Sequence, residues 1–242
     1  MLTLSPPAPL PRRLERAARA LADGEPVLIF DAADREAETD MVFLSEKATP
    51  ELVRLARKDA GGLFCTAISA ELRRRLGLPF FTELIEAAKD RFPEVAALAE
   101  QPRYDRRSAF GITINHRANY TGVPDNDRAL TIRTVGEIAR AAPTVSDSAL
   151  RESFRRAFVS PGHVYLILAA DGLLDERKGH TELTISLARM AGLSESVTVC
   201  EMLGDSGGAR DPGAARRYAE LHGFEFLEGA AIVEAWRAWS SA

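Results

Sequence analysis

The sequence predicts an α+β fold: a single three-layer domain in which a mixed, twisted β-sheet is flanked by helices. Short apolar runs typical of buried strands alternate with segments that repeat apolar residues at helical spacing along the whole chain. No linker, change of composition or internal repeat divides the chain. Its 242 residues, 46% of them hydrophobic, can bury a large core, so we expect one domain over residues 1–242.

The first elements are a helix and two strands. Four apolar residues at helical spacing predict a helix over 14–21, which Asp23-Gly24 ends. The apolar runs 27–31 and 41–44 predict strands.

A second helix starts at Thr49-Pro50-Glu51, where a capping hydroxyl, a proline in the first turn and an early acid favour a helix N-terminus. The same local rules predict the elements up to residue 141. They are the end of this helix at Gly61-Gly62, a strand over 63–68, a short helix capped by Ser69 and ending at Leu76, a strand over 110–115 and a helix over 125–141.

The second half repeats the alternation. We expect strands over 164–168 and 197–203, helices over 181–191 and 212–222, and a last strand and helix. The charged stretch 80–107, with one helix over 82–100, interrupts the regular alternation and is interpreted as an insertion.

Composition narrows the class of protein. A formal charge of -4 gives no overall attraction to nucleic acid or anionic membranes. No apolar run is long enough to span a bilayer, and residues 1–11 lack the pattern of an export signal, so we expect a cytoplasmic protein. The two cysteines, Cys65 and Cys200, lie in apolar runs without CxxC spacing, which fits a reducing compartment.

The most informative segment, residues 31–40, joins two expected strands and carries five acids beside one arginine. If its second half is extended, Glu36, Glu38 and Asp40 share one face, each roughly 6.6 Å from the next. Three neighbouring carboxylates repel one another unless a cation, an arginine or a hydroxyl-rich ligand compensates them. The segment therefore indicates a site for a metal and a polyol; a solvated surface turn is the alternative.

A second polar segment, residues 177–182, stands directly before an apolar helix. It brings two cations, a glycine and a threonine hydroxyl to the positive end of that helix, which suits a phosphate. A capped surface helix with an incidental basic turn explains the pattern equally well. His180 could complete a metal site begun by a carboxylate elsewhere.

Two further residues stand out at strands. His163 begins an expected buried strand and could be a general acid or base, or simply a strand-end residue. Glu201 lies inside an apolar run on the face opposite Cys200, and acids in such strands need a partner or a task. Residues 204–208 read like a serine-protease nucleophile segment, but the helical context favours a turn after a strand.

Together these segments resemble the 3,4-dihydroxy-2-butanone-4-phosphate synthase family, riboflavin-pathway enzymes that convert ribulose 5-phosphate to a four-carbon phosphate and formate. The resemblance covers most of the chain. Its six motifs, in the expected order, are residues 34–40, 60–65, 121–133, 161–164, 179–182 and 200–201.

The resemblance implies a role for each site residue. Glu36 and His180 would hold a divalent metal, Mg²⁺ or Mn²⁺, and Arg35, Glu38 and Asp40 would serve the sugar hydroxyls and proton transfers. Catalysis would also need His163 and Glu201, with Cys65 lining the pocket. The remaining substrate contacts would come from Thr121, Glu36 and Glu201, and, for the phosphate, from Arg177, Lys178, Gly179, His180 and Thr181.

The resemblance also has implications for the oligomeric state and the number of domains. The family is homodimeric, with sites near the subunit interface. The insertion at 80–107 resembles the longer archaeal members, and the chain offers no cysteine cluster for the zinc site of a fused cyclohydrolase, so we expect a monofunctional enzyme.

Departures from the family pattern are Ser160 in place of an arginine, Lys178 in place of a glycine, and the turn 204–207. Two other classes of protein are alternatives to the synthase family. One is an RNA- and ATP-binding relative, which the acidic charge disfavours, and the other is a hydrolase acting through Ser206.

Overall fold

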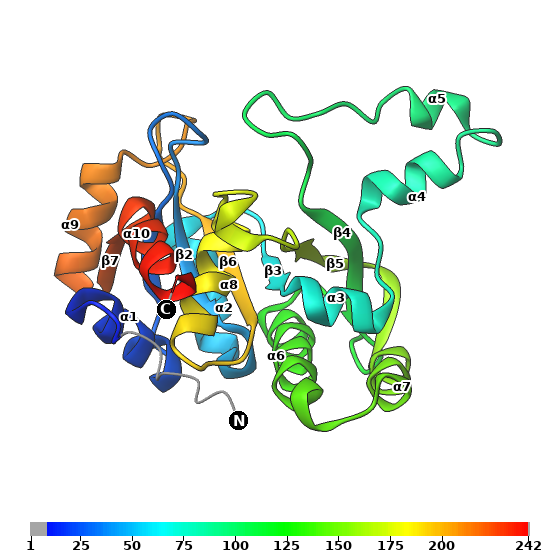
Figure 1. The fold of residues 1–242 in the computed structure, drawn as a ribbon, viewed down its shortest axis with the longest axis horizontal. Helices are drawn as coiled ribbons and strands as arrows, with labels where there is room; N and C mark the ends of the chain where they lie inside the picture. Colours follow the sequence, from blue (N-terminus) through cyan, green and yellow to red (C-terminus); the bar gives the residue numbers. More distant parts are fainter. Residues whose placement is uncertain (1–8, 242) are drawn as a thin grey trace.

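A seven-stranded sheet in the order β4-β5-β3-β6-β2-β1-β7 forms the centre of the computed structural model, which describes residues 9–241 (Figure 1). The pairs β1/β7 and β3/β5 are parallel and the other neighbours are antiparallel. The strands are β1 (Val27–Phe30), β2 (Thr39–Leu44), β3 (Cys65–Ile68), β4 (Phe110–His116), β5 (Phe158–Leu168), β6 (Ser196–Glu201) and β7 (Glu225–Glu228). The mixed sheet of an α+β fold is thus confirmed.

Helices cover both faces of this sheet. They are α1 (Arg12–Asp23), α2 (Pro50–Leu55), α3 (Ala70–Leu76), α4 (Phe81–Ala87), α5 (Pro93–Ala96), α6 (Asp125–Ala141), α7 (Asp147–Ala157), α8 (His180–Met190), α9 (Pro212–His222) and α10 (Gly229–Ser240). None of the helices within residues 9–241 is both long and apolar enough to cross a membrane.

The three layers follow from the alternation of side chains along the strands. On one face, Cys65, Val197 and Val199 pack in a single core with buried residues of α1, α8 and α10. On the other face, Cys200 and Met202 pack against α2, α6 and α9, while α3 and α7 extend that layer beside β4 and β5. Glu201 lies between Cys200 and Met202 in sequence and so points to the α8 face, as expected.

Three elements of the structure differ from the expectation. The helix expected over 82–100 is two short helices, α4 and α5, because Pro93 lacks the N–H and the space that a helix interior requires. Helix α7 was not expected, and only Leu150 in it is buried. Strand β5 begins at Phe158, six residues before the expected start at Val164.

The segment 80–107 projects to one side of the molecule beyond β4 (Figure 1). No residue of α4 or α5 is buried. The segment is held at its base, where the buried Phe80 ring lies 3.7 Å from the guanidinium carbon of Arg107 and 4.9 Å from that of Arg73. Residues 1–8 and 242 lie outside the described part, so the expected domain boundaries there remain a prediction.

Candidate active site

The functional residues gather where three adjacent strands, β2, β6 and β3, present side chains to the α8 face. Asp40 of β2 is the register partner of Glu201 in β6, and Cys65 of β3 is paired with Val199. A cavity of about 300 Å³ lies over this part of the sheet, and we name it the site cavity. The residues expected in the site that line it are Arg35, Glu36, Glu38, Asp40, Cys65, Arg177, His180, Thr181 and Glu201.

The acidic segment is folded around Asp31. Its buried carboxylate accepts hydrogen bonds from the backbone N–H groups of Glu36 and Glu38, both at 3.1 Å, and from Arg35 at 3.2 Å. The extended geometry expected for residues 36–40 holds only from Thr39, since Ala37 has a φ of 55°. The two backbone hydrogen bonds nonetheless turn Glu36 and Glu38 toward the same cavity as Asp40.

His180 is the first residue of α8 and is buried. Its Nε2 atom donates to the carbonyl oxygen of Ile29 in β1 at 3.2 Å. Its Nδ1 atom lies 3.3 Å from Glu36 Oε2 and 3.5 Å from Asp40 Oδ2. The ring therefore turns one nitrogen toward two carboxylates from the opposite side of the cavity.

This arrangement fits a divalent cation. One ligand atom each of Asp31, Glu36 and His180 lies within 4.8 Å of the others. Both oxygens of Asp31 already accept hydrogen bonds from the loop, which leaves Glu36 and His180 as the better donors. Within the described residues, the buried Oδ1 of Asp40 has no hydrogen-bond partner, so a buried oxygen beside the pair also lacks compensation.

Burial and neighbouring charges set the protonation states of Glu36, Asp40 and His180. Burial alone would raise the pKa of Glu36, but the hydrogen bond to His180 and the charge of Arg35 lower it to about 2. Burial raises the pKa of Asp40 to about 8. Burial disfavours the charged form of His180, yet Asp40 and Glu36 together raise its pKa to about 9. Near neutral pH the site thus holds protons that a bound cation would have to displace.

Glu201 is positioned by the residues directly before β3. Its Oε2 atom accepts the N–H of Leu63 at 2.7 Å. A Cβ atom on Gly62 would lie 2.2 Å from the same oxygen, so only glycine leaves room for the carboxylate there. Burial raises the pKa of the neighbouring Cys65 thiol well above its ordinary value, which keeps that pocket-lining group neutral.

The basic turn before α8 divides between two cavities. Arg177 and Thr181 line the site cavity, whereas Lys178 lines a larger neighbour of about 1410 Å³, which we name the outer cavity. Gly179 is the N-cap of α8 and lies beneath two arginines, since a Cβ there would be 2.3 Å from Arg177 Nη1 and 2.7 Å from Arg35 Nη2. The turn thus presents helix N–H groups and guanidinium groups together.

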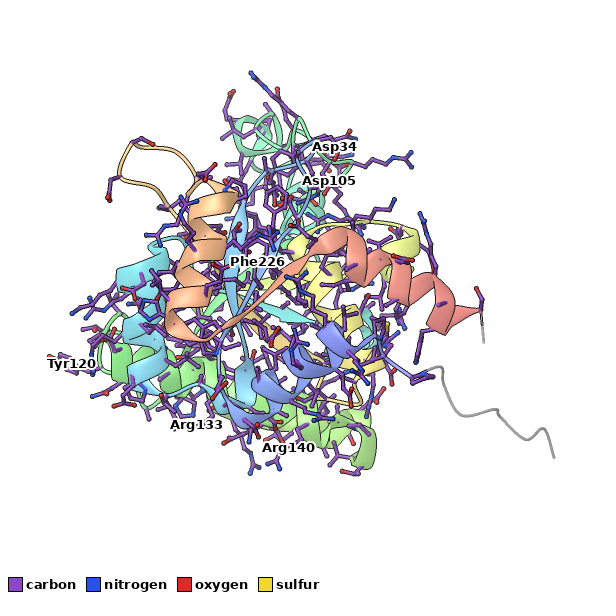
Figure 2. The ribbon with its side chains drawn as sticks, turned by 90° about the vertical axis from the view of Figure 1, so that its left-hand side faces the viewer. Asp34, Asp105, Tyr120, Arg133, Arg140 and Phe226 are labelled. Carbon is purple, nitrogen blue, oxygen red and sulfur yellow. The ribbon has the colours of Figure 1, made fainter. Side chains whose placement is uncertain are left out.

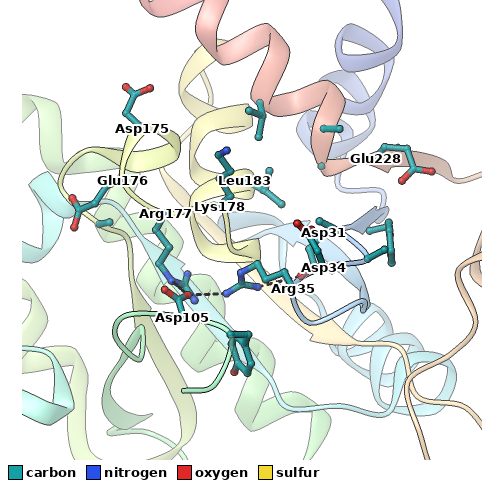
Figure 3. Close-up of a pocket in the computed structure, with 18 of the residues that line it drawn as sticks. Asp31, Asp34, Arg35, Asp105, Asp175, Glu176, Arg177, Lys178, Leu183 and Glu228 are labelled. Carbon is teal, nitrogen blue, oxygen red and sulfur yellow. Dashed lines mark hydrogen bonds and ion pairs between the residues drawn. The ribbon is translucent and has the colours of Figure 1, made fainter. Parts of the chain in front are cut away.

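Figure 3 shows how Arg177 and Arg35 are joined across the outer cavity. Asp105 Oδ2 accepts from Arg177 Nε at 2.5 Å and from Arg35 Nη2 at 3.0 Å. Arg177 also donates to the buried Glu182 at 2.6 Å. In Figure 2, Asp34 and Asp105 lie at the same end of the molecule.

Two expected residues lie away from both cavities. His163 of β5 and Thr121, in the loop after β4, are exposed and form a separate group, in which Asn115 of β4 contacts the His163 ring at 3.0 Å and the Thr121 carbonyl at 3.4 Å. Neither occurs among the described residues that line the site cavity. Tyr120, next to Thr121, is 99% exposed and lies at the periphery of the molecule (Figure 2).

Three residues of the site were not assigned from sequence. Asp31 stands directly after the buried strand β1, a position that could have indicated a loop-anchoring role. Tyr104 and Asp105 lie in the stretch 80–107, where no periodicity or motif marks them. The 204–208 segment is an exposed turn after β6, as expected, closed by a bridge between Leu203 and Ala209.

Comparisons with known proteins identify one family. A family model described as 3,4-dihydroxy-2-butanone 4-phosphate synthase matches residues 15–235. The 3,4-dihydroxy-2-butanone 4-phosphate synthase of Methanothermobacter thermautotrophicus is 44% identical over 230 residues, which are 94% of this chain and 97% of that protein.

Solved structures share the fold. The crystal structure of the Candida albicans 3,4-dihydroxy-2-butanone 4-phosphate synthase aligns with a TM-score of 0.68 at 27% identity, over 93% of this chain and 98% of that one. A 3,4-dihydroxy-2-butanone 4-phosphate synthase in complex with two magnesium ions aligns with a TM-score of 0.69 at 23% identity, over 90% of this chain and 93% of that one.

Proposed function

The chain belongs to the 3,4-dihydroxy-2-butanone 4-phosphate synthase family of riboflavin biosynthesis, and we propose that it converts D-ribulose 5-phosphate to L-3,4-dihydroxy-2-butanone 4-phosphate and formate. One observation carries the proposal. The carboxylates that suit a cation and a polyol and the basic helix start that suits a phosphate line one cavity, although they lie more than 130 residues apart in sequence. A sugar phosphate needs both chemistries in one place.

Glu36 and His180 would hold the cation, Mg²⁺ or Mn²⁺, since a carboxylate oxygen suits both ions. When bound, the cation supplies Lewis-acid polarisation of the sugar oxygens, which favours enediolate formation. Asp31 would act indirectly, because its hydrogen bonds to the loop orient Glu36.

Proton transfers fall to groups around the sugar position. Burial raises the pKa values of both Asp40 and Glu38, and the pKa of Asp40 reaches about 8, so Asp40 can carry a proton near neutral pH. Glu201 is adjacent to Asp40 across β2 and β6 and is held by Leu63. These three carboxyl groups can supply and accept the protons of dehydration, skeletal rearrangement and formate loss.

The phosphate would lie at the start of α8. There the free N–H groups of the first turn, the Thr181 hydroxyl and the Arg177 guanidinium converge, and Lys178 adds charge from the outer cavity. Arg35 reaches the same place through Asp105.

The distant position of His163 and Thr121 supports a homodimer. Both are exposed; His163 lies on β5, and Thr121 lies in the loop after the edge strand β4. We propose that each subunit presents them to the site cavity of the other, so that His163 of the partner subunit completes the catalytic groups.

Cys65 and Cys200 are buried free thiols, which suits a reducing cytoplasm.

The test is formate release. The protein is incubated with ribulose 5-phosphate and Mg²⁺ or Mn²⁺, and formate is measured over time. We expect formate in both cases and none without the sugar phosphate. Absence of formate with either metal would contradict the proposal, whereas activity that survives exhaustive chelation would contradict the metal assignment alone.

A further inference from the structure

The contact between Asp105 and the two arginines stands at the boundary of the two cavities. Arg35, Tyr104 and Arg177 line both the site cavity and the outer cavity, and Asp105 lines the outer one. The side chain of Asp105 is only 12% exposed, although its segment is otherwise at the surface. A carboxylate therefore occupies the place where the guanidinium groups of Arg35 and Arg177 meet.

Two other carboxylates on these arginines are fixed by backbone N–H groups, and a third, Glu36, pairs with Arg35 at 2.6 Å from within the acidic segment. Asp31 accepts two backbone N–H groups of the acidic segment, and Glu182 accepts the N–H of Ala170 at 2.9 Å. Both side chains are fully buried. Neither can leave its arginine without breaking a buried backbone hydrogen bond.

Asp105 is attached differently. Its Oδ1 accepts the N–H of Arg106, its own neighbour, so the carboxylate and its backbone can move together. The segment that carries it is held at residues 80 and 107 by the stacking of Phe80 and Arg107, and no residue of α4 or α5 within it is buried. Movement of residues 101–106 therefore exposes little buried apolar surface.

We propose that Asp105 is a placeholder for the substrate phosphate: its carboxylate binds Arg35 and Arg177 until a phosphate dianion displaces it and detaches residues 101–106 from the site. The inference rests on the proposed function, which places the phosphate at Arg177. A phosphate has three acceptor oxygens and up to two charges, so it can satisfy both guanidinium groups better than one carboxylate does.

Competition by Asp105 would make the site specific for phosphorylated ligands. A sugar without a phosphate offers no anion to replace Asp105, so Arg35 and Arg177 stay joined and the boundary between the cavities stays closed. Asp105 thus selects for phosphorylated ligands by competition rather than by direct contact.

The experiment measures binding of inorganic phosphate to the wild-type protein, to Asp105→Asn, and to the control Glu86→Gln. Glu86 of α4 offers a matched change from carboxylate to amide in the same segment, since its ion pair, with Lys89, lies at the surface. We expect Asp105→Asn to bind phosphate at least about threefold more tightly, because the competing state is weakened, and the control to bind as the wild type does. Weaker or unchanged binding in Asp105→Asn would overturn the proposal.

A second measurement needs no variant at Asp105. Phosphate should increase amide hydrogen exchange of residues 101–106 in the wild-type protein, and unchanged or slower exchange would also overturn the proposal.

Arg177→Gln separates the placeholder role of Asp105 from the phosphate position in the proposed function. If wild-type protein binds no phosphate, or Arg177→Gln binds it equally well, the phosphate position in the proposed function is wrong. If Arg177→Gln loses binding while Asp105→Asn gains none, only the placeholder role is wrong.

Discussion

The Nε2 atom of His180 lies 3.2 Å from the carbonyl oxygen of Ile29. Because a carbonyl oxygen can only accept, Nε2 carries the proton, and a neutral ring then presents the lone pair of Nδ1 to Glu36 and Asp40. The backbone of β1 thus decides which nitrogen of a residue in α8 is available to a cation.

Metal affinity should rise with pH. In the metal-free protein the pKa of His180 is about 9, so below that pH a cation must displace a proton from Nδ1. We expect the affinity for Mg²⁺ or Mn²⁺ to rise by up to about tenfold per pH unit between pH 7 and 9 and then to level off. Calorimetric titrations in buffers of different ionisation enthalpy would measure both affinity and proton release. A pH-independent affinity would contradict the assignment, and His222→Gln, on the surface of α9, should keep the wild-type profile.

Glu36→Gln should remove the cation rather than the fold. The amide keeps the shape of the side chain but loses the charge that faces His180 and Arg35. We expect metal affinity to fall by more than about 100-fold, since even the outer partners of metal ligands contribute 10- to 100-fold, and formate release to fall with it. Glu152→Gln, an exposed change on α7, serves as the control for both measurements. Wild-type metal affinity in Glu36→Gln would exclude Glu36 as a ligand.

Gly62→Ala should impair catalysis through Glu201. The added Cβ would lie 2.2 Å from Glu201 Oε2 and would push the carboxylate off the N–H of Leu63. Groups that transfer protons contribute about 10²- to 10⁴-fold, so we expect kcat to fall toward the value of Glu201→Gln while metal affinity stays the same. Gly208→Ala, where no atom lies within 4 Å of the added Cβ, should retain full activity. Equal activity of the two alanine variants would show that the position of Glu201 does not matter.

Subunit mixing should test the composite site. Glu36→Gln and His163→Gln are each expected to be inactive alone. If His163 of the partner subunit completes the site, a mixed dimer contains one intact site, so co-expression should restore about a quarter of wild-type activity. Restoration fails if both residues act within one subunit. Chromatography of each variant must show the same oligomeric state, so that the comparison concerns the site alone.

Local rules in the sequence determined most of the helices and strands, and they marked two segments as candidate binding segments. Apolar periodicity and capping residues predicted β1, α6 and α8, because such signals depend only on neighbouring residues. The same reasoning marked the acids at 36–40 and the basic turn at 177–182 as binding segments. It overlooked Pro93, whose ring divides the helix expected over 82–100.

Only the tertiary structure decided which of these residues meet. His180 reaches Glu36 across 144 residues of sequence, and Asp105 reaches Arg35 and Arg177 across 70 and 72. Such pairings depend on the order of strands in the sheet and on the way in which α8 packs against it, which no local pattern encodes. For the same reason the family resemblance grouped His163 with the acids, whereas the sheet places it on β5, outside the cavity of its own subunit.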